Sequence, residues 1–275
     1  MGRALLGVLL LGACSPVASP LQRAPSGVVS LNPCTDAILA DVADPAQIRA
    51  LSAYSSDPGS SSMDLATARR FPAVSGTVEE IAALRPALVI AGTFTPPATR
   101  NALARLGIPL VEVPIAQSVV QSEAQVRQIA ALAGQPARGE ALVVRIEAAL
   151  AAARPADSRR IPALVWQSGG IVPGQQTLIA DLLARTGFAH AAAAKGLRQA
   201  DFLPLERVVA QPPAVILAAG DHSGEDRLLT HPVLKRITGT TRAHLDSSLL
   251  WCGGPTIIRA AARLREIRQV AGNAA

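Results

Sequence analysis

The side chains best suited to hold a bulky ligand stand where predicted strands end. The chain has 275 residues but only seven aromatic ones. Four of these lie at the carboxyl ends of apolar, strand-length runs: Tyr54, Phe94, Trp166 and Trp251. Polar neighbours that would orient a ligand are Ser55, Thr93 and Ser168. Open α/β sheets bind ligands at this end of their strands, between apolar walls and a few polar groups. These seven residues are the predicted ligand site. The alternative is that Trp166 and Trp251 fill the protein core.

Two of the three cysteines are predicted to face the same site. Cys34 and Cys252 each follow or end a predicted strand, one in each half of the chain, and the third is Cys14. An exported protein can carry a disulfide, whereas unpaired cysteines are usually small buried side chains. A disulfide, a thiol pair and two buried cysteines therefore remain open from the sequence.

Direct metal binding and catalysis find little support. All four histidines lie in the second half: His190, His222, His231 and His244. A metal ion held between two halves needs ligands from both. The sequence has no HExxH, GxSxG, CxxC or P-loop motif. We therefore expect a binding protein rather than an enzyme, with no catalytic residue, no metal site and no cofactor.

One segment of the chain occurs twice. Residues 77–92 read TVEEIAALRPALVIAG, and residues 204–220 read PLERVVAQPPAVILAAG. In both, an acidic helical turn precedes a proline and an apolar run, with Glu79 matching Glu206. A proline before an apolar run ends a helix and begins a buried strand. Each half is thus predicted to contain the same helix–proline–strand unit.

The repeat and the alternation of apolar runs with helices predict an α/β fold with two lobes. We expect two Rossmann-like lobes with mainly parallel sheets, at 28–135 and 156–275, and a ligand cleft between them. One long helix at 136–155 is predicted to join them, because its apolar residues recur at helical spacing. The last strand is predicted at 248–252, where the sequence reads SLLWC.

The N-terminus has the pattern of an export signal. Residues 1–13 contain one arginine and then an apolar run too short to span a bilayer. Residues 11–14, LGAC, resemble the lipobox of bacterial lipoproteins, in which the cysteine, here Cys14, becomes the acylated first residue. Residues 14–27 are rich in proline and serine and are predicted to form a tether. Cleavage near Ser15 or Ser19, which gives a free protein, is the alternative.

The charge pattern gives no sign of nucleic-acid binding. The formal net charge is +6, but lysines and arginines are scattered rather than clustered. No aromatic residues are interleaved with basic ones as in single-strand binders. We expect no nucleic-acid partner.

Several segments together resemble the periplasmic substrate-binding proteins of importers for vitamin B12 and iron–siderophores. The similar segments are VVSLNPCTDAIL, LSAYSSDP, GTVEEIAALRPALVIAG, LPLERVVAQPPAVILAAG and WCGGPTIIRAAARL. The resemblance covers nearly the whole mature chain. It implies two α/β lobes joined by a long helix. It also implies that Glu79 and Glu206 dock the receptor onto permease arginines. A carboxylate in the first turn of a helix is also favourable without any partner.

The resemblance makes this chain an expected receptor of an ABC importer. Its ligand would be a metal–organic chelate, either a corrinoid or a ferric siderophore. Its partners would be the transmembrane permease subunits and, through the lipid anchor, a membrane. We expect a monomer in the periplasm. Alternatives are a receptor for haem or for a free metal ion and, less favoured, an α/β enzyme.

Overall fold

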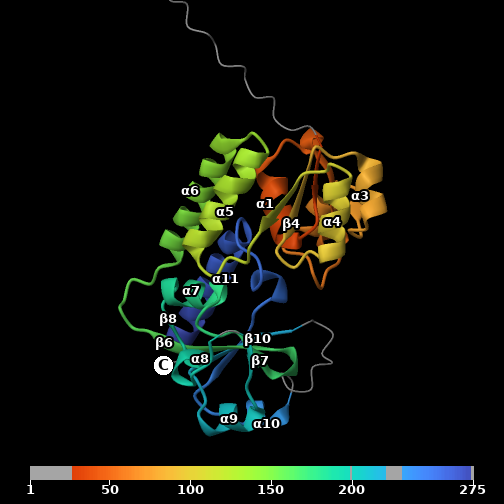
Figure 1. Cartoon of the computed structure of the whole chain (residues 1–275). Helices are drawn as coiled ribbons and strands as arrows, with labels where there is room; N and C mark the ends of the chain where they lie inside the picture. The colour runs from red at the N-terminus through yellow and green to blue at the C-terminus, as the bar shows by residue number, and fades with distance from the viewer. Residues whose placement is uncertain (1–26, 199, 221–230, 274–275) are drawn as a thin grey trace, which may run out of the picture.

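The computed structural model describes residues 27–198, 200–220 and 231–273. The described chain forms two lobes, each built around its own sheet (Figure 1). The predicted signal, Cys14 and nearly all of the tether lie outside the described residues, and so does His222. No helix among the described residues is long and apolar enough to cross a membrane.

The N-terminal lobe contains a five-stranded parallel sheet in the order β3-β2-β1-β4-β5. The strands are β1 Val28–Ser30, β2 Ile48–Ser52, β3 Ala73–Val74, β4 Leu88–Gly92 and β5 Leu110–Val113. The helices are α1 Pro33–Val42, α2 Leu65–Ala68, α3 Val78–Leu84, α4 Pro97–Arg105 and α5 Val119–Leu132. Helices cover both faces, so the central strands consist of consecutive buried residues. The strand order reverses between β1 and β4, and such a switch point opens a crevice at the carboxyl ends of the strands.

The C-terminal lobe contains a four-stranded parallel sheet in the order β11-β10-β6-β8. Its strands are β6 Ile161–Gln167, β8 Phe188–His190, β10 Val215–Ala219 and β11 Thr241–His244. A separate antiparallel ribbon pairs β7 Ile171–Val172 with β9 Asp201–Phe202. The helices are α7 Leu178–Arg185, α8 Ala191–Ala194, α9 Leu205–Ala210, α10 Pro232–Lys235 and α11 Thr256–Asn273.

The predicted strand at 248–252 is wrong. Ser247–Leu249 form a short 3-10 helix, and the edge strand is β11, which pairs with β10. The apolar pair Leu249 and Leu250 resembles a strand in the sequence. The side chain of Asp246, however, accepts a hydrogen bond from the Ser248 amide (2.9 Å) and starts a helical turn instead.

The repeated segment forms the same unit in both lobes. α3 and β4 stand on either side of Pro86, and α9 and β10 on either side of Pro213. In the first copy, Arg85 ends α3 in the left-handed conformation (φ 47°), directly before the proline. Neither helix continues past its proline, because proline hinders helical geometry in the residue before it.

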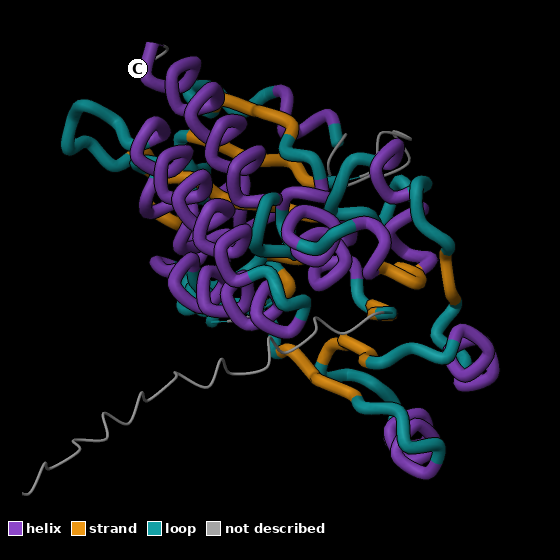
Figure 2. Tube along the Cα trace, turned by 90° about the horizontal axis from the view of Figure 1, so that it is seen from above, coloured by secondary structure: helices purple, strands orange, loops and turns teal. Residues whose placement is uncertain are grey.

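Two long helices, α6 at Pro136–Ala153 and α11, pack against each other where the lobes meet. α6 buries Leu142, Ile146 and Leu150 at helical spacing. It packs against α5 on one side and against α11 on the other. Figure 2, which views the molecule from above, shows several helices stacked side by side near the C-terminus. α6 covers the residues predicted for a linking helix, and α11 lies beside it. One apolar core runs continuously from the first sheet through these helices to the second.

Candidate functional site

Two adjoining cavities lie between the lobes, with volumes of about 400 and 460 Å³. They share six lining residues: Thr93, Phe94, Pro114, Ile115, Ala116 and Trp251. Small-molecule sites typically enclose about 300–1,000 Å³. Together the cavities form the inter-lobe cleft, and Phe94 and Trp251 line both parts.

The first cavity opens at the switch point of the N-terminal sheet. Its lining follows β1, β4 and β5 and is closed by residues 251–253. Asn32, two residues after the end of β1, accepts a hydrogen bond from the Cys34 amide (2.9 Å) through its side chain. This cap turns the chain from the strand into α1 and brings Cys34 and Thr35 into the cavity wall. At the end of β4, a side chain on Gly92 would lie only 3.0 Å from Asn32 Nδ2.

The second cavity spans both lobes. The N-terminal lobe contributes residues 93–94 and 114–117. The C-terminal lobe contributes Gln167 at the end of β6, the turn before α7 and the first residues of that helix. In this turn the Thr177 hydroxyl donates a hydrogen bond to the Gly174 carbonyl (2.7 Å). Because both lobes contribute, a ligand here would contact both at once.

Large apolar side chains remain exposed along the cleft. The exposed fraction is 82% for Phe94, 62% for Ile115 and 55% for Trp251. Contiguous exposed apolar surface commonly marks a binding site. A ligand that covers this surface would gain about 25 cal/mol of binding free energy for each Å² of apolar area removed from water.

The described residues that line the two cavities carry no charge. None is aspartate, glutamate, lysine, arginine or histidine. Their polar side chains are amides and hydroxyls: Asn32, Gln117, Gln125, Gln167, Gln176, Thr35, Thr93, Thr177, Ser60 and Ser62. Gln125 is held in place because its Nε2 donates to the Pro114 carbonyl (2.6 Å). The cleft therefore offers neutral hydrogen-bond donors and acceptors beside apolar walls.

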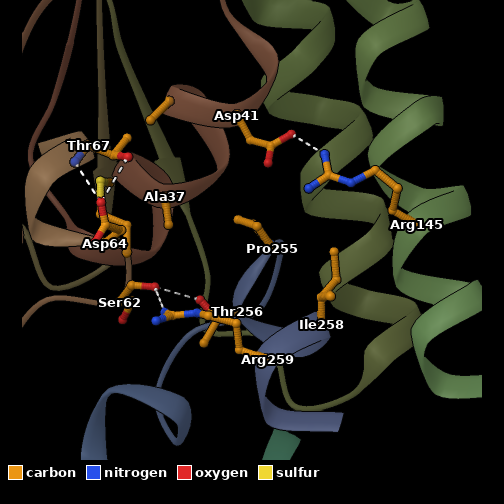
Figure 3. Close-up of a pocket in the computed structure, with 12 residues that line it drawn as sticks. Ala37, Asp41, Ser62, Asp64, Thr67, Arg145, Pro255, Thr256, Ile258 and Arg259 are labelled. Carbon is orange, nitrogen blue, oxygen red and sulfur yellow. Dashed lines mark hydrogen bonds and ion pairs between the residues drawn. The ribbon is translucent and has the colours of Figure 1, made fainter. Parts of the chain in front are cut away.

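Behind the cleft, the lobe junction is charged. A smaller cavity of about 270 Å³ lies between α1, α6 and α11 (Figure 3). Arg145 of α6 pairs with Asp41 of α1 (2.9 Å). At the start of α11, the Thr256 hydroxyl and the Arg259 guanidinium both donate to the Ser62 carbonyl. These contacts fasten α11 to the N-terminal lobe.

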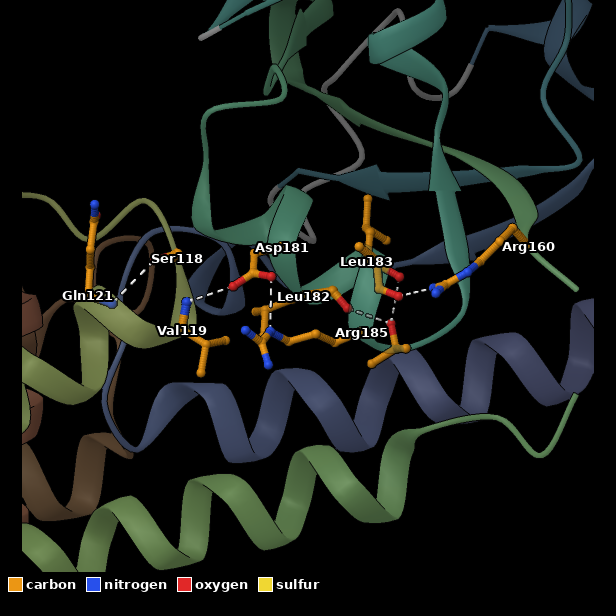
Figure 4. Close-up of polar contacts among 10 residues, drawn as sticks. Ser118, Val119, Gln121, Arg160, Asp181, Leu182, Leu183 and Arg185 are labelled. Atoms are coloured by element: carbon orange, nitrogen blue, oxygen red, sulfur yellow. Dashed lines mark hydrogen bonds and ion pairs between the residues drawn. The ribbon is translucent and has the colours of Figure 1, made fainter. Parts of the chain in front are cut away.

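A second polar contact joins the lobes at α5 and α7 (Figure 4). The Val119 amide in the first turn of α5 donates to Asp181 Oδ2 (2.8 Å). The other oxygen of Asp181 pairs with Arg185 on the same helix (2.9 Å). A carboxylate at a helix N-terminus satisfies a free amide and complements the helix dipole. Here that carboxylate comes from the opposite lobe.

A comparison with protein-family models decides the family. Residues 28–244 match the model described as "Periplasmic binding protein". The chain belongs to this family. The predicted family and the predicted class of fold are thereby confirmed. Members are periplasmic ligand-binding proteins that serve transport. No curated protein matches the chain in sequence.

Solved structures share the fold of this periplasmic binding protein. The periplasmic heme-binding protein RhuT from Roseiflexus sp. RS-1 is 22% identical, with a TM-score of 0.70 over 91% of this chain and 99% of that one. Periplasmic heme-binding protein HutB of Vibrio cholerae is 18% identical, with a TM-score of 0.71 over 88% and 98%. Periplasmic vitamin B12-binding protein BtuF of Vibrio cholerae is 17% identical, with a TM-score of 0.68 over 89% and 97%.

The structure brings three of the seven predicted ligand residues of this periplasmic binding protein to the cleft: Thr93, Phe94 and Trp251. Tyr54 is 60% exposed after β2, and Ser168 is exposed after β6, but neither lines the two cavities. The glutamines of the cleft were missed by the sequence analysis. In the sequence, only their position could have indicated them, because Gln117 and Gln167 lie at or just after the ends of apolar runs.

Trp166 does not form a cleft wall. It is fully buried in β6, in a core cluster with Leu164 and Ile216, and its indole nitrogen has no hydrogen-bond partner among the described residues. The alternative that Trp166 fills the core is therefore correct. Side chains alternate between the faces of a strand, and it is the next residue, Gln167, that lines the second cavity.

Ser55, another predicted ligand residue, does not line the cleft, because its side chain is buried and hydrogen-bonds to Asp36. Its hydroxyl donates to Asp36 Oδ2 (2.7 Å), and the Ser52 amide donates to the same oxygen (2.9 Å). Burial raises the pKa of Asp36 to about 8, although hydrogen bonds, the largest being that of Ser30, act in the opposite direction. Asp36 thus anchors the turn that carries Tyr54.

Cys34 and Cys252 form a disulfide in the structure. Their sulfur atoms are 2.10 Å apart and their Cα atoms 4.8 Å apart. Both residues line the first cavity. The bond connects α1 of the N-terminal lobe with the segment that follows the C-terminal sheet.

Glu79 and Glu206 occupy equivalent places in the two lobes. Each lies in the first turn of its helix, α3 or α9, and each is exposed. The carboxylate of neighbouring Glu80 accepts hydrogen bonds from the amide and the hydroxyl of Ser75, and these bonds lower its pKa. Docking by Glu79 and Glu206 stays a prediction.

Proposed function

We propose that this periplasmic binding protein is the exported receptor of an ABC importer and that it captures a large, uncharged metal–organic chelate of the corrinoid class. The observation that carries the choice of ligand is the neutral cleft. Apolar walls from Phe94, Ile115 and Trp251 stand beside amide and hydroxyl groups, without a charged side chain among the described lining residues.

The chemistry of the candidate ligands separates them. A corrinoid is a flat macrocycle whose rim carries neutral amides, which pair well with glutamine, asparagine and threonine side chains. Haem carries two carboxylates, and many ferric siderophores are anionic. A buried anion without a cationic partner is costly, and anion sites typically use arginine or lysine. The described lining offers neither.

The structural relatives support both ligand classes. Of the three structures described above, one is named for vitamin B12 and two for heme. Haem is therefore the second candidate, with a ferric siderophore and a free metal ion behind it. A free metal ion lacks support because no group of three or more metal-binding side chains occurs among the described residues.

The deciding measurement is a binding panel on the exported protein. Tryptophan fluorescence would be followed during titration with cyanocobalamin, haem and several ferric siderophores, and calorimetry would confirm the affinities. We expect cyanocobalamin to bind far more tightly than the anionic ligands. Tight binding of haem, or of a siderophore, with no response to cyanocobalamin would reject the corrinoid assignment.

Trp251→Ala tests whether the cleft is the site. Removing this wall should weaken cyanocobalamin binding about tenfold or more, as expected for an aromatic hot spot. The matched control is Phe202→Ala, which truncates an aromatic residue that is similarly exposed (58%) but lines neither cavity. Equal affinities for the two variants would place the ligand elsewhere.

Delivery and anchoring complete the proposal. Glu79 and Glu206 present the loaded receptor to the permease. Exposed ion pairs contribute about 0–1 kcal/mol each, so they orient the complex more than they tighten it. Acylation of Cys14 tethers a monomeric receptor to the membrane. Metabolic labelling with a fatty-acid analogue tests the anchor, because Cys14→Ala should abolish the label.

A further inference from the structure

The segment 251–256 follows the C-terminal sheet in sequence but is fixed to the N-terminal lobe. The Cys34–Cys252 disulfide binds it to α1. The Gly254 amide donates to Ser122 Oγ on α5 (2.7 Å), and the Thr256 hydroxyl donates to the Ser62 carbonyl (2.9 Å). The chain therefore passes from one lobe to the other at Trp251.

Two glycines let this segment lie against the helices of the N-terminal lobe. A methyl group on Gly253 would overlap the Ser122 side chain on α5. A methyl group on Gly254 would overlap Ile38 on α1, and Gly254 also has a positive φ of 61°. Only glycine permits so close an approach with this backbone conformation.

Trp251 stands beside the covalent anchor. It precedes Cys252 directly, lines both cavities and is 55% exposed. Its own side chain has little packing to hold it, because more than half of its surface is free. Ordering a mobile side chain on binding costs conformational entropy and so reduces affinity. A side chain that is already held in place before binding avoids this cost.

We propose that the Cys34–Cys252 disulfide is a positioning element of the ligand site, which holds Trp251 in the cleft wall so that ligand affinity depends on the bond. The claim that ligand affinity depends on the disulfide rests on the proposed function. The claim that the disulfide fixes the position of Trp251 is independent of it. The hydrogen bonds of Gly254 and Thr256 hold the main chain beyond the bond, whereas the disulfide fastens the residue next to Trp251 itself.

Breaking the bond is a two-electron reduction. With a water-soluble phosphine, the phosphine is oxidised to its oxide by taking the oxygen of one water molecule. The two protons of that water end on the two sulfur atoms, which become thiols. With thiols at Cys34 and Cys252, segment 251–256 would be joined to α1 only by non-covalent contacts.

The test follows Trp251 directly in the Trp166→Phe protein, where it is the only tryptophan. Acrylamide quenching and fluorescence anisotropy would be measured for the oxidised protein, for the phosphine-reduced protein and for a Cys34→Ser/Cys252→Ser variant. We expect quenching to rise and anisotropy to fall when the bond is absent. The same signals measured on phosphine-treated wild-type protein cover the case in which a variant fails to fold.

Cyanocobalamin affinity is measured on the same samples. The dissociation constant should rise about tenfold when the disulfide is lost, because Trp251 is no longer fixed in advance. Ser122→Ala is the matched control: it removes a hydrogen bond to the same segment but keeps the disulfide, and it should change affinity less.

The outcomes separate the two proposals. If Trp251 mobility and affinity stay unchanged while only the melting temperature falls, the bond is a stabiliser and the positioning role is rejected. If the oxidised protein does not bind cyanocobalamin, the corrinoid proposal fails. The quenching and anisotropy measurements still decide the position of Trp251 in that case, since they require no ligand.

Discussion

The cleft and the region behind it differ in chemistry, although both lie between the same two lobes. The described lining of the cleft is uncharged and leaves Phe94 and Trp251 exposed. Behind it, a continuous apolar core and the hydrogen bonds of Thr256 and Arg259 to the Ser62 carbonyl join the lobes, and the Arg145–Asp41 ion pair fastens α6 to α1. The front therefore keeps free surface for a ligand, and the back supplies the contacts that hold the lobes together.

This division also bears on motion. Hinges between domains usually lie where few contacts cross. Here α6 and α11 pack along the junction, and the disulfide and the Val119–Asp181 hydrogen bond cross it as well. We therefore expect small changes in lobe separation on ligand binding rather than wide opening and closing.

The largest effect should come from Trp166, in the core of the C-terminal lobe. Trp166→Ala removes a fully buried side chain and should lower the free energy of unfolding by about 3–5 kcal/mol. Protein that remains folded should bind ligand with unchanged affinity, the opposite of Trp251→Ala. Denaturant titration with ligand binding on the same samples checks both. A loss of affinity without a loss of stability would contradict the distinction between the two residues.

The next effect concerns Asp36 and pH. Its pKa in the folded protein is about 8, above the value of 3.8 for an unperturbed carboxyl. The folded state therefore retains a proton that the unfolded state loses, and the stability contributed by this proton is complete below pH 4. It is lost as the pH rises toward 8, by at most about 1.4 kcal/mol per pH unit.

Asp36→Asn isolates this contribution. An amide cannot ionise but still accepts hydrogen bonds from Ser52 and Ser55. Denaturant unfolding at several pH values between 4 and 8 should show a smaller decrease of stability with pH for the variant. Identical pH profiles for the two proteins would mean that Asp36 titrates without linkage to folding.

Asp181→Ala tests the polar contact behind the cleft. It removes the acceptor of the Val119 amide and the partner of Arg185. The free energy of unfolding should fall by about 1 kcal/mol, as for the loss of a helix cap. The affinity for ligand should change little, because Asp181 lines neither cavity. An affinity loss as large as that of Trp251→Ala would show that this contact sets the geometry of the cleft.

The smallest effect on binding is expected from the two exposed glutamates. Glu79→Ala with Glu206→Ala should leave ligand affinity unchanged and reduce uptake in cells that carry the permease. Glu80→Ala is the control, since Glu80 bonds to Ser75 in its own lobe. Normal uptake by the double variant would reject the docking role.

The elements of the fold were largely predictable, because their signals are local. The prolines at 86 and 212 each follow the end of a helix, and the apolar runs after Pro86 and Pro213 form β4 and β10. The prediction failed at 248–252, where apolar residues form a 3-10 turn. The edge strand β11 has the polar sequence TRAH, which gives no strand signal, and it is defined by its pairing with β10.

The candidate site was predictable only in part. Position at a strand end selected Thr93, Phe94 and Trp251, which line the cleft, but also Trp166 and Ser55, which are buried. A strand covered on both faces shows no alternation of apolar and polar residues, so the sequence does not reveal which side chain faces the cleft.

By itself, the sequence determined the two lobes, their common helix–proline–strand unit and the family, because these depend on residue order along short stretches. Only the tertiary structure decided that Trp251 rather than Trp166 lines the cleft, that Asp36 is buried as an acid, and that Cys34 meets Cys252. These features depend on which segments pack against each other, and Cys34 and Cys252, 218 residues apart along the chain, are neighbours only because the two lobes pack together.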